Sequence, residues 1–97
     1  MNSNNWVSFF AEFIGTFIFV LVILKVGEPI PIGIALIAMI YFGSKMSLGA
    51  FNPAVATGLY LRHELNTTQY LVYIVAQILG AVTAFHVYNY TAVKSES

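Results

Sequence analysis

The sequence predicts an all-α membrane protein, with three transmembrane helices and one re-entrant half-helix in a single domain over residues 1–97. The 97 residues are 59% hydrophobic and only 8% charged, whereas soluble domains carry roughly a quarter charged residues. Two apolar runs, at about 7–26 and 68–88, reach the ~20 residues that a bilayer-spanning helix needs. A third apolar segment, 47–61, is too short to cross and therefore indicates a re-entrant element.

The same composition argues against other classes of protein. The chain has no net charge and no cysteine, so neither a basic surface for nucleic acid nor a disulfide framework is expected. No metal-ligand spacing is found around His63 or His86, so we expect no metal, no cofactor and no enzyme activity. The start of the chain lacks a basic region and a small-residue cleavage site, so the first apolar run is expected to be retained.

The first predicted helix, 7–26, contains one acidic residue, Glu12, in an otherwise apolar run that Lys25 closes. A carboxylate at the centre of a membrane helix costs about 3 kcal/mol on insertion scales. Such a residue normally faces the interior of the bundle, where it finds donors. The alternative is that Glu12 lies near enough to the interface for its carboxylate to reach water.

The second predicted helix begins at Pro31 and ends near Gly43 or Ser44. Pro29 and Pro31 disfavour helix just before them, and proline is tolerated at a helix start. The resulting helix, about 31–44, is short, which is consistent with a chain that turns inward.

The third predicted helix, about 68–88, carries a stripe of small residues that lets helices approach closely in lipid. Its members are Ala76, Gly80 and Ala84. Gln77 is the only strongly polar residue in the middle of this helix, and an interhelical hydrogen bond is one explanation for it.

The re-entrant segment 47–61 contains Asn52-Pro53-Ala54, a strong helix-start signal. Asn is a favoured N-cap, and Pro suits the first helical position. A helix from Pro53 to Leu61 would be about 13 Å long, so its positive end would lie within the membrane. Irregular backbone at that depth is tolerated where it lines a watery cavity. The carbonyls expected to line such a pore are those of Leu48, Gly49, Ala50 and Phe51.

Three stretches, in this order, resemble the aquaporins and glycerol facilitators, the major intrinsic proteins. Residues 11–16 (Ala-Glu-Phe-Ile-Gly-Thr) resemble the family's first-helix motif, and 47–56 resemble its loop and half-helix, with the Asn-Pro-Ala signature. Residues 73–81 (Tyr-Ile-Val-Ala-Gln-Ile-Leu-Gly-Ala) resemble its third helix. The likeness runs from Ala11 to Phe85 and matches the first half of a family member, so the resemblance implies a single aquaporin-like repeat.

The resemblance implies roles for several residues. Glu12 and Gln77 would support the backbone of the half-helix loop, and Gly15 would serve helix packing. The amide of Asn52 would point at the pore. In the family two inverted repeats bring their half-helices together at the bilayer centre, so this chain would need a second half, most economically an inverted copy. The basic residues divide evenly between the two sides, with Lys45 and Arg62 on one and Lys25 and Lys94 on the other, which is compatible with both orientations.

The family's filter positions, applied to an antiparallel dimer, give an apolar constriction. Its residues would be Ile32 from one chain and Ile40, Gly49 and Val55 from the other. Three positions depart from the family pattern: Leu48 stands where glycine is usual, Ala50 where histidine is frequent, and Val55 where second repeats carry arginine.

The sequence therefore favours a passive channel for water or small neutral solutes, in contact with membrane lipid and self-associated as an antiparallel dimer or higher oligomer. One alternative is a non-conducting half-channel that associates with or regulates a full-length relative, and another is a truncated fragment. A third hypothesis is a small lesion-forming membrane protein, which would leave Asn52, Glu12 and Gln77 unexplained.

Overall fold

The computed structural model describes residues 4–96, with side chains as far as residue 92. This part of the chain forms four helices and contains no strand, so the predicted all-helical class is confirmed. The helices are α1 (Asn5–Lys25), α2 (Pro29–Gly43), α3 (Pro53–Leu61) and α4 (Thr67–Glu96).

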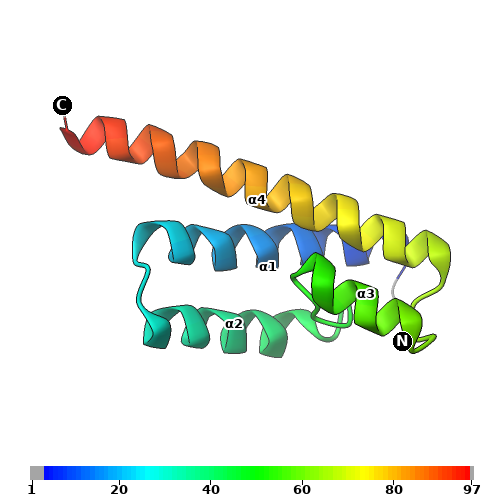
Figure 1. Cartoon of the computed structure of the whole chain (residues 1–97). Coiled ribbons are helices and arrows are strands. Elements are labelled where there is room, and N and C mark those ends of the chain that lie inside the picture. The colour runs from blue at the N-terminus through cyan, green and yellow to red at the C-terminus, as the bar shows by residue number, and fades with distance from the viewer. Residues whose placement is uncertain (1–3, 97) are drawn as a thin grey trace.

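The helices are arranged around α1, which lies between α4 and α2 (Figure 1). After α2, the chain enters a loop, and α3 then runs outward to the end of the molecule where α4 begins (Figure 1). The close backbone approaches among these helices are those of α1 with α4, α1 with α2, and α3 with α4. The loop between α2 and α3 is held against α1 and α4 by hydrogen bonds to side chains of both helices, which position the candidate site.

Two helices are long and apolar enough to span a membrane: α1, and α4 over Thr67–Ala92. The 15-residue α2 is apolar but shorter, and α3 has nine residues. A third membrane crossing by α2 and a re-entrant path for α3 remain predictions.

Three helix boundaries differ by two residues or more from those expected. Helix α1 begins at Asn5, not Val7. Helix α2 begins at Pro29, not Pro31, with Glu28 at the N-cap position. Both prolines fit because the first N–H groups of a helix have no intrahelical partner in any case. Helix α4 continues beyond Tyr88 to Glu96, since neither glycine nor proline interrupts the sequence there. The side chain of Lys94, which contributed to the predicted charge balance, lies outside the described residues.

Helices α1 and α4 pack with their backbones unusually close together at Gly80. A Cβ atom added there would lie 2.6 Å from the carbonyl oxygen of Phe13, so only glycine permits this approach. Ala76 and Ala84, one turn away on either side, are fully buried. The small-residue stripe of α4 therefore faces α1.

Candidate functional site

The side chain of Glu12 lies at the centre of the candidate site. It is completely buried, and its carboxylate accepts four hydrogen bonds. Oε1 accepts from the backbone N–H of Phe51 at 2.8 Å and from Nε2 of Gln77 at 2.8 Å. Oε2 accepts from the hydroxyl of Ser47 and from the N–H of Ala50 at 3.3 Å. Because a carboxylate has about four acceptor sites, Glu12 has no capacity left for a solute, and it does not reach an interface as the alternative required.

The loop between α2 and α3 has its backbone donors turned toward the protein. The N–H of Leu48 donates to the hydroxyl of Tyr73 at 2.7 Å, and that of Gly49 donates to Oγ of Ser47 at 3.0 Å. With the two bonds to Glu12, all four N–H groups of residues 48–51 are satisfied by side chains. No N–H or hydroxyl among the described residues donates to the four carbonyls of this stretch, so they remain available as acceptors.

The loop depends on two residues with left-handed backbone conformation. Gly49 has φ +70°, which glycine adopts at little cost. Phe51 has φ +52°, an arrangement that costs a non-glycine residue about 1–3 kcal/mol. Its buried ring contacts Gly15 of α1 and Gly43 of α2, where an added Cβ would lie within 3 Å of ring carbons. This packing and the hydrogen bond to Glu12 hold Phe51 in its strained conformation.

Asn52 caps α3 through its side-chain oxygen, so its amide N–H donors are not used in capping. Its Oδ1 accepts from the N–H of Ala54 at 2.8 Å, and Pro53 occupies the first helical position. The exposed Asn52 side chain can therefore donate from Nδ2 in the same region as the positive end of α3. This arrangement can bind the oxygen of a neutral solute while repelling a cation.

Gln77 acts on the loop differently from the role that the resemblance implied. Its Nε2 donates to Glu12 and not to the loop backbone, and its Oε1 has no hydrogen-bond partner among the residues that the structure describes. Gln77 therefore supports the loop indirectly, by positioning the carboxylate of Glu12.

Three further side chains hold the loop and were missed in the sequence: Ser8, Ser47 and Tyr73. The hydroxyl of Ser8 donates to the carbonyl of Met46 at 3.1 Å. Spacing could have revealed two of them, because residues four apart share a helix face. Ser8 lies four residues before Glu12, and Tyr73 lies four residues before Gln77.

The four predicted constriction residues do not converge within one chain. Gly49 adjoins Ile40, since a Cβ built at Gly49 would lie 3.7 Å from the Cα of Ile40. Ile32 lies eight residues before Ile40, near the start of α2. Val55 lies on α3, which packs against α4 and not against α2. A constriction made by all four residues therefore needs a second half.

Comparison with known proteins identifies the family. The sequence model of the family described as "Major intrinsic protein" matches residues 26–96. "Glycerol uptake facilitator protein-like 6" of Lactiplantibacillus plantarum is 35% identical over 86 residues, covering 78% of this chain and 39% of that protein. "Aquaporin PIP1-1" of Arabidopsis thaliana is 36% identical over 94 residues, covering 79% and 33%. "Aquaporin Z" of Photorhabdus laumondii is 34% identical over 59 residues, covering 61% and 26%. No solved structure gave a significant match.

These findings first define the class of protein. It is an integral membrane protein, and its family indicates a channel and not an enzyme. The chain belongs to the major intrinsic protein family. It spans about two-fifths or less of the length of the curated relatives described above.

The contact of Tyr73 with the loop can be tested with Tyr73→Phe. This change removes the acceptor of the Leu48 N–H and leaves a partly buried donor unpaired, at a cost of about 1–3 kcal/mol. We expect amide hydrogen exchange at Leu48 to become faster. Tyr70→Phe is the matched control, because the Tyr70 hydroxyl contacts Thr57 on α3 at 2.8 Å and not the loop. Equal exchange at Leu48 in both variants would contradict a supporting role for Tyr73.

Proposed function

We propose that the chain forms half of a passive membrane channel for water or small neutral solutes. The observation that supports this proposal is that the loop at residues 48–51 pairs its backbone N–H groups but not its carbonyls. Its N–H groups are all bonded to side chains of the protein, whereas its carbonyls have no donor among the described residues. A row of unpaired carbonyls that ends at a capped helix start can exchange hydrogen bonds with a file of small polar molecules.

The charges of the site support passage of neutral molecules. The carboxylate of Glu12 is buried and fully paired, so it offers no binding site to a passing cation. The positive end of α3 and the free amide donors of Asn52 oppose cations further. Both features favour uncharged solutes that can accept a hydrogen bond.

The pore needs a second half, and we propose an inverted second copy of the chain. Asn52, Pro53, Ala54 and Val55 are all exposed in one chain, although they form the start of the half-helix. Inverted repeats commonly build sites at the membrane midplane. In this arrangement Ile32 from one copy and Ile40, Gly49 and Val55 from the other form the constriction, twice per dimer.

Substitution of Asn52 tests the pore directly. Asn52→Ala removes both the cap, worth about 1 kcal/mol, and the amide donors, and we expect neutral-solute flux in proteoliposomes to fall sharply. Asn52→Asp keeps a capping oxygen but adds a negative charge, so flux should fall and cation leak should appear. Parental flux in folded Asn52→Ala would show that Asn52 does not line a pore.

The orientation of the chain tests the inverted pair. A tag after Ser97 should be accessible from both sides of the membrane. Two lysines added at the N-terminus should bias every copy to one orientation and abolish flux, and co-expression of an oppositely biased variant should restore it. A parental tag found on one side only would exclude the inverted homodimer. Flux seen only together with a full-length relative would instead favour a half-channel that associates with that relative.

The apolar constriction predicts the selectivity. Ile32, Ile40, Gly49 and Val55 offer no side-chain donors to order water, and an apolar constriction can close by dewetting. We expect modest water permeability and relatively better passage of glycerol or ammonia, measured side by side with urea and a proton-leak control. Val55→Arg should narrow and charge both constrictions, so the larger solutes should lose permeability first. Fast water flux with glycerol rejected would mean that other residues form the constriction.

A further inference from the structure

The half-helix α3 is joined to α4 by a polar contact that does not involve Glu12. The hydroxyl of Thr57 lies 2.8 Å from the backbone carbonyl oxygen of Pro53 and 2.8 Å from the hydroxyl of Tyr70 on α4. A hydroxyl has one proton to donate, and a carbonyl oxygen can only accept. Both hydroxyl protons are used when Thr57 donates to Pro53 and Tyr70 donates to Thr57. In this arrangement Tyr70 acts on the first turn of α3 through Thr57.

A single peptide group connects this contact to the cap of α3. The carbonyl of Pro53 and the N–H of Ala54 belong to the same planar peptide group. The carbonyl accepts from Thr57, and the N–H donates to Oδ1 of Asn52 at 2.8 Å. The amide of Asn52 then has its Nδ2 donors left for another acceptor. The hydrogen bonds from Tyr70 to Asn52 therefore all run in one direction, donor to acceptor, and we call this series the relay.

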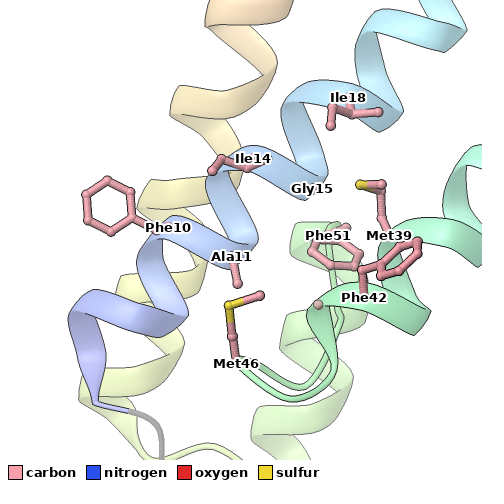
Figure 2. A pocket seen from close by; sticks show the side chains of 10 residues that line it. Phe10, Ala11, Ile14, Gly15, Ile18, Met39, Phe42, Met46 and Phe51 are labelled. Carbon is pink, nitrogen blue, oxygen red and sulfur yellow. The ribbon is translucent and has the colours of Figure 1, made fainter.

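Both ends of the relay are held by packing. The ring of Tyr70 stacks on that of Tyr60, with centroids 4.5 Å apart and an interplanar angle of 12°, which limits the movement of the hydroxyl. At the other end Asn52 follows Phe51, whose buried ring lies beside Gly15 of α1 (Figure 2). The first turn of α3 is itself exposed, so its position is set from these two sides.

We propose that Tyr70 is a positioning residue that, through Thr57, orients the amide of Asn52 and strengthens its hydrogen bond to a small neutral solute. Hydrogen bonds in series polarise one another, by about 10–30% per bond. Donation from Tyr70 polarises Thr57 and then the peptide group, whose N–H draws electron density from Oδ1 of Asn52. Nδ2 thereby becomes a stronger donor. The effect on a solute rests on the function proposed above, whereas the relay as far as Asn52 does not.

NMR signals of the Ala54 amide and the Asn52 side-chain amide, measured in lipid nanodiscs, test the relay. Tyr70→Phe keeps the ring and removes the first donor, so both proton signals should move upfield. Thr57→Val removes the bond to the peptide group, and amide exchange at Ala54 should become about 2- to 10-fold faster. Thr57→Ser keeps the hydroxyl and should retain the parental signals. In the Thr57→Val background, Tyr70→Phe should change nothing further, because residues in one network are not additive.

The matched control is Tyr60→Phe, which removes the hydroxyl of the stacked partner ring. That hydroxyl contacts Thr67 at 3.0 Å and not the first turn of α3, so both signals should stay parental. Helix content measured by circular dichroism verifies that each variant folds. Parental signals in Tyr70→Phe, equal shifts in Tyr60→Phe, or additive effects of Tyr70→Phe and Thr57→Val would each overturn the proposal.

Glycerol flux in proteoliposomes separates this proposal from the proposed function. If the parent conducts, Tyr70→Phe should lower glycerol permeability and Tyr60→Phe should not. Parental permeability in Tyr70→Phe, together with shifted NMR signals, would overturn the effect of the relay on the solute. A parent that carries no flux would contradict the proposed function instead, and the NMR signals alone then decide whether Tyr70 positions Asn52.

Discussion

The buried carboxylate of Glu12 is the interaction on which the rest of the site depends. It joins three parts of the chain, because its four donors come from the loop at Ser47, Ala50 and Phe51 and from Gln77 on α4. A buried charge is tolerated when it is fully hydrogen-bonded, and loss of its partners is costly. The position of Glu12 on α1 therefore determines where the loop lies, and the loop in turn determines where α3 begins.

This arrangement leaves the backbone carbonyls of residues 48–51 as the unpaired polar groups of the loop among the described residues. Side chains of α1, α4 and the loop itself accept from every N–H group of residues 48–51, and no donor among the described residues bonds to the carbonyls of this stretch. The half-helix then adds the positive end of its dipole and the free amide donors of Asn52. Acceptors followed by donors along a short path suit a molecule that both donates and accepts hydrogen bonds, as water and small alcohols do.

Several parts of this arrangement could be predicted because single residues depart from the apolar sequence around them. Glu12 was visible as a charge in an apolar run, and the start of α3 was visible in Asn52 and Pro53. Tyr73 was not an exception of this kind, because a tyrosine in a membrane helix has an ordinary apolar use as well, and only its spacing of four residues from Gln77 could have indicated its role. The left-handed conformation of Phe51 and its contact with Gly15 and Gly43 could not be predicted either, since they arise from three segments that meet only in the folded chain. The sequence likewise could not show that Nε2 of Gln77 donates to the carboxylate of Glu12 and not to the backbone of the loop.

The hydrogen bonds of the loop also bear on the order in which the protein assembles. Glu12, Ser47 and Tyr73 of the same chain accept from all four N–H groups of residues 48–51. A newly inserted copy can therefore form its loop and its half-helix before it meets any second half. In the proposed dimer, association would then join two preformed surfaces without having to order the loop, so little conformational entropy would be lost at that step. For the proposed two-chain pore, assembly would thus separate into folding within one chain, followed by docking.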